Sequence, residues 1–254
     1  MRIGAVPYLN VRPLIYGIEH EIILLEPGPL ADRLRTGELD VGLVPVAEVL
    51  AHDAYDILDG VAIAARGAVE SVFVVHREPL PALRRVAVSP VSRTSVWLLR
   101  VLLKRRFGIA PEFYPRPPGA KLSEHEAMLL IGDDALWYAQ RNPTQARWDL
   151  GQAWVETTGL PFVFAVWAFR REIPRAEMMS VAPRLRRACA EGLAHLEDIV
   201  QNASESEPSF LRRYYRQCVW YELGEGEIAG LRRFQEWLAE EGLIPACHDL
   251  RFIP

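Results

Sequence analysis

Two segments of this chain nearly repeat each other, and this repeat limits the fold more than any other feature. Residues 2–7 (Arg-Ile-Gly-Ala-Val-Pro) and 85–90 (Arg-Val-Ala-Val-Ser-Pro) are short apolar stretches that both stop at a proline. Each runs into a polar segment suited to start a helix, residues 8–13 in the first copy and 91–95 in the second. In open α/β sheets, ligands bind just beyond the carboxyl ends of the strands. The repeat therefore predicts two similar α/β lobes with a cleft between them.

The composition predicts a globular, cytoplasmic protein. Half of the 254 residues are apolar, which is enough for one large core or two smaller ones. The formal net charge of -4 argues against nucleic acid or an anionic membrane surface as the main partner. The chain has no signal-peptide pattern at its start and no apolar run near the roughly 20 residues of a membrane span. We therefore expect no nucleic-acid and no membrane partner, and the sequence leaves open whether the protein forms a homodimer.

Strand and helix patterns alternate in both halves of the chain. In the first half we expect helices at 11–19 and 30–38 and strands at 22–25, 41–46, 57–65 and 71–76. In the second half we expect a helix at 92–107 ended by Gly108, strands at 112–114 and 128–131, a helix at 135–140, and extended segments at 149–154 and 162–169. Helical patterns follow at 181–201, 208–221 and 226–241. The predicted organisation is a first lobe over 1–83, a second over 84–170, and a helical return to the first over 171–254.

The common catalytic and cofactor motifs are absent. The six histidines are scattered and the three cysteines lack the close spacing of a metal site. Neither the glycine fingerprint of dinucleotide binding nor the phosphate-binding loop with its lysine is present. We therefore expect no metal and no cofactor.

The segments that follow the two repeats carry the candidate ligand groups. Ser92, Arg93, Thr94 and Ser95 place three hydroxyls and a guanidinium at a helix start, where N–H groups attract a carboxylate or phosphate, although a single cap residue would explain part of this pattern. Asn10 occupies the matching place after the first strand, where it either contacts ligand or caps the turn. Asp133 begins another predicted helix, so its carboxylate either balances the helix dipole or takes part in the site.

Several of these segments together resemble a known family. They are Tyr8-Leu9-Asn10 with Pro13, residues 37–43 with Pro45, residues 92–95, residues 130–136, and residues 149–167 with the specific run Thr-Gly-Leu-Pro-Phe-Val-Phe-Ala-Val-Trp at 158–167. Over about residues 2–170 the chain resembles the chorismate dehydratases of the futalosine route to menaquinone.

This resemblance implies a type II periplasmic-binding-protein-like fold, with two α/β lobes, two crossovers, a central cleft and a helical C-terminal tail packed on the first lobe. It implies a carbon–oxygen lyase that converts chorismate to 3-[(1-carboxyvinyl)oxy]benzoate and water without a cofactor, with the enolpyruvyl carboxylate of the substrate accepting the proton. It also implies that Asn10 is catalytic. The predicted substrate-binding residues are Tyr8, Ser92, Arg93, Thr94, Ser95 and Asp133.

Two alternatives share the predicted architecture. A binding protein or ligand-sensing domain for a small anion would have the same lobes and cleft. The sister enzyme of the pathway, which forms dihydroxynaphthoate, would also have them, but residues 92–95 and 158–167 match the dehydratase better.

Overall fold

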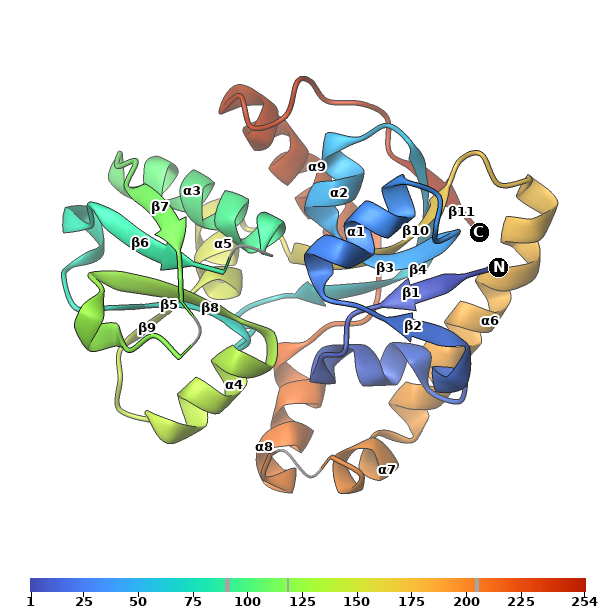
Figure 1. Cartoon of the computed structure of the whole chain (residues 1–254), viewed down its shortest axis with the longest axis horizontal. Coiled ribbons are helices and arrows are strands. Elements are labelled where there is room, and N and C mark those ends of the chain that lie inside the picture. Colours follow the sequence, from blue (N-terminus) through green and yellow to red (C-terminus); the bar gives the residue numbers. More distant parts are fainter. Residues whose placement is uncertain (90–91, 118, 204–205) are drawn as a thin grey trace.

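The chain folds into two lobes, each built on its own β-sheet (Figure 1). The computed structural model describes residues 1–89, 92–117, 119–203 and 206–254. Pro90 and Val91, the end of the second repeat and the start of its polar segment, lie outside the described residues. The predicted two-lobed α/β organisation is confirmed by the presence of two separate sheets.

The first sheet has six strands and is mainly built from the N-terminal part of the chain. Its order is β11 (Arg251–Ile253), β4 (Tyr55–Ala65), β10 (Phe162–Arg170), β3 (Val41–Pro45), β1 (Ile3–Ala5) and β2 (Ile22–Leu24). The strand β1 pairs in parallel with β2 and β3, whereas β10 runs antiparallel to β3 and β4. The helices α1 (Pro27–Arg35) and α2 (Val46–Ala51) belong to this unit. We call it, with the segments that pack on it, the first lobe.

The second sheet has five strands, and we call the unit built on it the second lobe. Its order is β7 (Glu112–Pro115), β6 (Arg85–Val88), β8 (Ala127–Ile131), β5 (Val72–His76) and β9 (Arg147–Asp149). The helices of this lobe are α3 (Arg93–Phe107), α4 (Gly132–Arg141) and α5 (Leu150–Thr158). In α3, Ser92 is the N-cap and Gly108 ends the helix in the left-handed region, as the sequence predicted.

The strands divide between the sheets at different points from the predicted boundaries at 84 and 170. The strand β5 already belongs to the second sheet, and β10 has returned to the first. The two crossovers therefore follow β4 and α5. Both strands are continuous apolar runs, and such a run does not show which sheet it joins, because its hydrogen-bond partners are distant in sequence.

Two local predictions were wrong. Residues 149–154 were expected to be extended, but α5 begins at Leu150, because Asp149 caps it by accepting a hydrogen bond from the N–H of Gln152. The predicted helix at 11–19 is instead the 3₁₀ helix Leu9–Ile15, which contains Pro13. Proline has no N–H to donate to an α-helical ladder.

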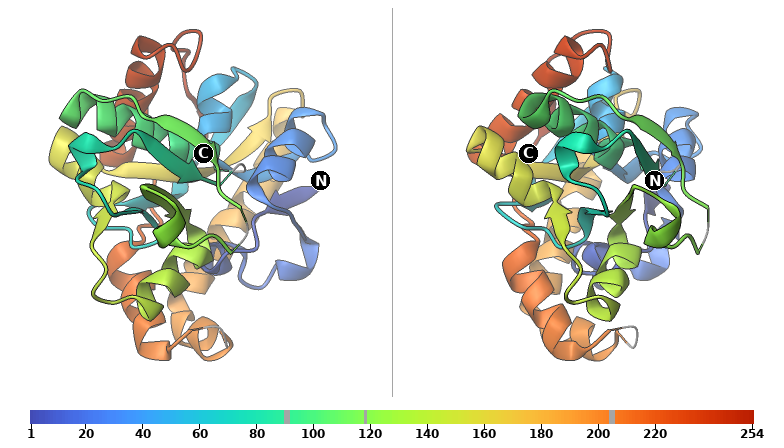
Figure 2. Two further views of the ribbon diagram at one scale, coloured as in Figure 1. Left: turned by 60° about the vertical axis from the view of Figure 1, so that its left-hand side comes forward. Right: turned by 90° about the vertical axis from the view of Figure 1, so that its left-hand side faces the viewer.

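The C-terminal third returns to the first lobe, where residues 196–201 and 208–213 lie at the lower end and residues 225–240 at the upper end in all three views (Figures 1 and 2). It contains α6 (Arg175–Ala194), α7 (Leu196–Gln201), α8 (Pro208–Arg213), a π-helical turn Tyr214–Cys218 and α9 (Glu225–Glu240). The predicted helix at 208–221 thus stops early, and Trp220 pairs with Ala64 of β4. The strand β11 was not predicted from the sequence. It pairs with β4 and forms one edge of the first sheet.

Close packing joins this tail to the segment that follows β1. A Cβ added at Gly192 of α6 would lie 2.1 Å from the carbonyl oxygen of Pro13. Only glycine lets α6 approach the 3₁₀ helix so closely. Since a core tolerates little change in volume, the tail fixes the position of the 3₁₀ helix.

An aromatic cluster next to the second crossover connects the tail with both lobes. The indole of Trp154 in α5 contacts Phe162 of β10 and Phe234 of α9 edge to face, with ring centroids 5.2 and 5.7 Å apart. All three side chains are fully buried. Burial of such rings dominates the energy of a core, so this cluster holds the lobes together on the crossover side.

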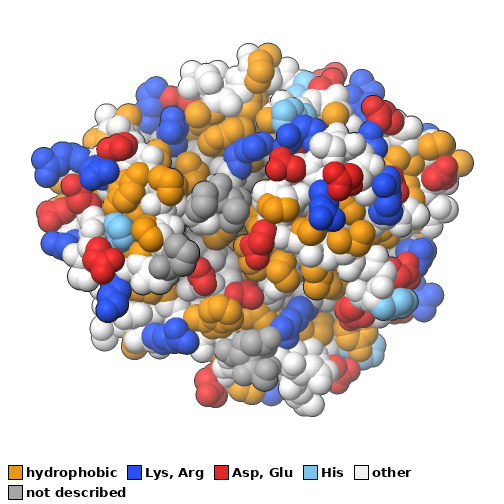
Figure 3. Space-filling model, viewed as in Figure 1, with side chains coloured by type: hydrophobic (Ala, Val, Ile, Leu, Met, Phe, Trp, Pro, Cys, Tyr) orange, Lys and Arg blue, Asp and Glu red, His pale blue; other side chains and the backbone are white. Residues whose placement is uncertain are grey.

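Charged side chains of both signs lie on the surface. On the face shown in Figure 3, basic and acidic side chains are interspersed and form no large patch of one sign. Within the described ranges, no helix is both long and apolar enough to cross a membrane.

Candidate active site

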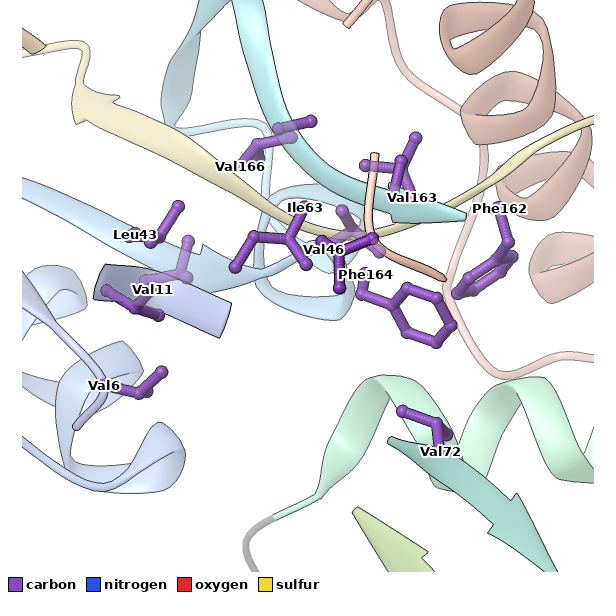
Figure 4. Packing of buried hydrophobic residues seen from close by; sticks show 14 of the residues in the cluster. Val6, Val11, Leu43, Val46, Ile63, Val72, Phe162, Val163, Phe164 and Val166 are labelled. Atoms are coloured by element: carbon purple, nitrogen blue, oxygen red, sulfur yellow. The ribbon is translucent and has the colours of Figure 1, made fainter. Parts of the chain in front are cut away.

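A cleft lies where the two lobes face each other, and its empty space, counted together with the open solvent at its mouth, is about 660 Å³. The first lobe contributes Val6, Leu43, Ile63 and Phe164 to one wall, and Val72 faces them from the second lobe (Figure 4). The remaining described lining residues are Tyr8, Asn10, Pro27, Pro45, Val69, Ser71, Ser92, Arg93, Thr94, Ser95, Ile131, Gly132 and Ala165. The mixture of apolar walls with few polar groups is typical of a site for one small molecule.

Asn10 lines this cleft from the first lobe. It lies in the 3₁₀ helix that follows β1, and its backbone carbonyl accepts a hydrogen bond from the hydroxyl of Tyr221 over 3.1 Å. Its side-chain oxygen Oδ1 is buried and has no hydrogen-bond partner among the described residues. Burying an unpaired amide oxygen costs free energy. Asn10 thus combines a place in the cleft wall with an amide oxygen that lacks a partner among the described residues.

The start of α3 faces Asn10 from the second lobe, as the repeat predicted. Ser92, Thr94 and Ser95 are buried and line the cleft. The side chain of Ser92 makes no capping hydrogen bond to its own helix. The first turn of a helix has backbone N–H groups without intrahelical acceptors. This end of the cleft therefore offers N–H and O–H donors to an anionic group.

Two residues of this helix start are also engaged across the lobe interface. The hydroxyl of Thr94 accepts a hydrogen bond from the backbone N–H of Ala47 in α2 over 3.0 Å. The guanidinium of Arg93 contacts the carboxylate of Glu48 over 3.3 Å. Glu48 is only 2% exposed and also accepts from Arg35 and Tyr55. Arg93 thus lines the cleft but already has an acidic partner in the other lobe.

Tyr8 reaches the second lobe from the chain just before Asn10. Its hydroxyl donates to Glu26 over 3.2 Å, and burial, with a smaller effect from the charge of Glu26, raises its pKa well above the usual range. Its ring lies against Gly132, where an added Cβ would be 3.2 Å from the ring and the backbone φ is +58°. A side chain at Gly132 would therefore be strained and would press on Tyr8.

The carboxylate of Asp133 contacts the backbone of the first lobe. The N–H of Leu9 donates to Oδ1 over 3.0 Å and lies 3.4 Å from Oδ2. Asp133 is not among the described residues that line the cleft. The structure therefore brings six of the seven predicted site residues to the cleft wall and places the seventh behind it.

Sequence reasoning missed the groups that support the site from behind. The hydroxyl of Tyr215 donates to the carbonyl of Leu9 over 2.9 Å, and Tyr214 donates to Ser71 in the cleft wall over 2.9 Å. Tyr221, described above, completes this set of tyrosines. They lie more than 140 positions from their partners, so no local pattern indicated the contacts.

The donor set of the cleft does not suit a resident metal. Across the ranges that the structure describes, no three His, Cys, Asp or Glu side chains lie close enough together to hold a metal ion. The described lining includes no histidine, lysine or cysteine. Its chemistry is that of hydroxyls, one amide, one guanidinium and backbone N–H groups around an apolar space.

Comparisons with known proteins agree with this architecture. Residues 1–240 match the family described as menaquinone biosynthesis. A chorismate dehydratase from Thermus thermophilus is 35% identical over 262 residues, which cover 93% of this chain and 94% of that protein.

Among solved structures, a protein from Archaeoglobus fulgidus superposes with a TM-score of 0.77 at 22% identity, covering 95% of this chain and 98% of that one. The periplasmic aliphatic sulphonate binding protein of Escherichia coli has a TM-score of 0.64 at 16% identity and covers 98% of this chain and 95% of that one. These likenesses confirm the predicted periplasmic-binding-protein-like fold.

Proposed function

Because this chain belongs to the menaquinone biosynthesis family, we propose that its cleft dehydrates chorismate to 3-[(1-carboxyvinyl)oxy]benzoate. The chain is similar to a chorismate dehydratase along nearly its whole length. The structural observation that carries the proposal is the cleft itself, in which Asn10 and the hydroxyl-rich start of α3 face each other across apolar walls.

The cleft suits the ring of chorismate and one of its carboxylates. The apolar side chains of Leu43, Ile63 and Phe164 would contact the faces of the six-membered ring. A carboxylate directed at the start of α3 would receive hydrogen bonds from Ser92 and from free backbone N–H groups. The aliphatic sulphonate binding protein that shares this fold also binds an anion.

The reaction removes a proton from the ring carbon that carries the enolpyruvyl ether and a hydroxyl from the neighbouring ring carbon. The electron pair of the broken C–H bond completes the aromatic ring as the hydroxyl leaves, and proton and hydroxide form water. The elimination is redox-neutral, and the gain of aromaticity drives it.

The described lining holds no histidine or lysine to accept that proton. The enolpyruvyl carboxylate of the substrate is attached to the same ring carbon through the ether, so it is the base nearest to the proton. The protein then supplies no base, and its role is to hold the substrate carboxylate close to the proton that it removes. Holding reacting groups in a near-attack geometry accounts for large rate factors in such reactions.

Asn10 would bind the ring hydroxyl that leaves in the reaction. Its buried Oδ1 is free to accept a hydrogen bond from the ring hydroxyl, which would hold that hydroxyl in one orientation. Ser71, which also lines the cleft, already accepts a hydrogen bond from Tyr214. We therefore assign the catalytic role to Asn10 and the binding of a carboxylate to Ser92 and Ser95.

The test is direct. Purified protein is incubated with chorismate, and the ultraviolet spectrum is followed for an aromatic product whose mass is that of chorismate less one water. The Asn10→Ala protein is the matched control. Cyclised futalosine, the substrate of the sister enzyme, is assayed in parallel. Turnover of that compound without turnover of chorismate would overturn the proposal, and so would binding of chorismate without any conversion.

A further inference from the structure

The backbone of Leu9 and Asn10 is held by hydrogen bonds from two parts of the molecule, the C-terminal tail and the second lobe. Tyr215 and Tyr221, which lie in the C-terminal tail, donate to the carbonyls of Leu9 and Asn10 over 2.9 and 3.1 Å. Both tyrosine side chains are buried. The pKa of Tyr221 is raised far above its usual value, chiefly by burial, so its hydroxyl remains a donor at any ordinary pH. These bonds fix the two peptide groups on either side of Asn10 relative to the first lobe.

The preceding peptide group, between Tyr8 and Leu9, is held by the second lobe. Leu9 N–H donates to Asp133 Oδ1 over 3.0 Å, and Asp133 lies 124 positions away at the start of α4. A hydrogen bond to a charged acceptor is stronger than one between neutral groups. Leu9 is 1% exposed, so its N–H would have little access to water if this acceptor were lost.

The two anchors make the orientation of Asn10 depend on the second lobe. When α4 is in its observed place, Leu9 has both its N–H and its carbonyl bonded, and the next residue, Asn10, lines the cleft. If the second lobe moved away, the bond from Leu9 to Asp133 would be lost, while the bonds from Tyr215 and Tyr221 would be kept. Misplacing a catalytic group by about 1 Å can cost about 100-fold in rate.

We propose that Asp133 is a positioning residue, which acts through the Leu9 N–H to align Asn10 when the lobes are together. This inference rests on the proposed function. It assigns to Asp133 no contact with substrate. Chemistry at Asn10 is thereby restricted to the arrangement in which α4 is docked on the 3₁₀ helix.

The test compares three substitutions at the start of α4. Asp133→Ala removes the acceptor, whereas Asp133→Asn keeps an acceptor oxygen without the charge. Asp134→Ala is the matched control, because Asp134 is the next residue in the same helical turn, carries the same charge, is itself exposed and pairs with Arg116 rather than with Leu9. For each protein, kcat and KM for chorismate, the dissociation constant of the product and the exchange rate of the Leu9 amide with deuterium are measured.

We expect kcat to fall about 10- to 100-fold in Asp133→Ala, to recover largely in Asp133→Asn and to stay normal in Asp134→Ala. KM and product affinity should change by less than about threefold, and the Leu9 amide should exchange faster only in Asp133→Ala. An equal loss of kcat in Asp134→Ala would overturn the proposal, because it would reflect helix charge rather than the bond to Leu9.

A combination with Asn10→Ala separates this proposal from the proposed function. If Asp133 acts through Asn10, Asp133→Ala causes no further loss of kcat in the Asn10→Ala protein. Independent, multiplying losses, or a loss confined to product affinity, would show that Asp133 acts elsewhere and overturn the positioning role. If the unaltered protein does not convert chorismate, the proposed function itself fails.

Discussion

The hydroxyl of Thr94 in the second lobe accepts a hydrogen bond from the backbone N–H of Ala47 in the first lobe over 3.0 Å. Thr94 is 4% exposed and also lines the cleft. The same side chain therefore contributes to the wall of the site and to the contact between the lobes. A ligand that needs both walls gains affinity from every bond that favours this arrangement.

Thr94→Val should weaken product binding. Valine keeps the shape of threonine but removes the acceptor, and a net loss of about 1 kcal/mol corresponds to roughly a fivefold higher Kd. Thr94→Ser keeps a hydroxyl and should bind nearly as well as the unaltered protein. Isothermal calorimetry with 3-[(1-carboxyvinyl)oxy]benzoate measures both. Equal affinity in the valine and serine variants would contradict the prediction.

Ser92→Ala should weaken product binding by a different route. Its hydroxyl is not used to cap α3, so we expect it to donate to a carboxylate of the ligand. Losing a hydrogen bond to a charged group costs about 1.5 to 3 kcal/mol, while the stability of the helix should change little. Calorimetry and thermal unfolding of the same protein test the two statements. A lower melting temperature with unchanged affinity would mean that Ser92 only caps the helix.

Asn10→Ala should lower kcat by about 100-fold or more, as does removal of other positioned hydrogen-bonding groups. Its melting temperature should be unchanged or slightly higher, because Oδ1 is buried without a partner among the described residues and its removal relieves that cost. Steady-state kinetics and calorimetric unfolding give the two numbers. A destabilised protein with near-normal kcat would identify Asn10 as a structural residue.

Tyr221→Phe should lower kcat more than it raises KM. The substitution removes only the hydroxyl that donates to the Asn10 carbonyl, so it frees the backbone beneath the catalytic amide. Tyr114→Phe is the control, because it removes a hydroxyl bonded to His125 in the second lobe, outside the described cleft lining. We expect about a tenfold loss of kcat in the first variant and none in the second. Similar kinetics in both would exclude a role for Tyr221 in the site.

The rate should be independent of pH between about 6 and 9. No histidine, lysine or cysteine is among the described lining residues, and the pKa of Tyr8, which ordinarily lies above this range, is raised further by its burial and by Glu26. The base of the proposed mechanism is a substrate carboxylate, which is protonated only below about pH 4, so activity should be lost only as the pH falls toward that value. A plot of kcat against pH checks this. An ionisation near pH 6 or 7 that controls kcat would indicate a protein base.

The sequence by itself determined the elements and the two ends of the site. Alternating apolar strands and helical patterns predicted two α/β lobes, because secondary structure follows from local periodicity. The paired prolines after residues 2–6 and 85–89 predicted that Asn10 and the residues from Ser92 to Ser95 would face a common cleft, and the structure places them there. These features depend on neighbours in sequence, so they are readable without coordinates.

Only the tertiary structure decided which partners these groups have. The sheet to which β5 and β10 belong, the bond from Leu9 to Asp133, the pairing of Arg93 with Glu48 and the tyrosine bonds behind Asn10 all join positions at least 45 residues apart. A side chain with hydrogen-bonding capacity has many candidate partners along the chain. Packing of the two cores selects one of them, because buried polar groups must be paired within the space that the folded backbone leaves.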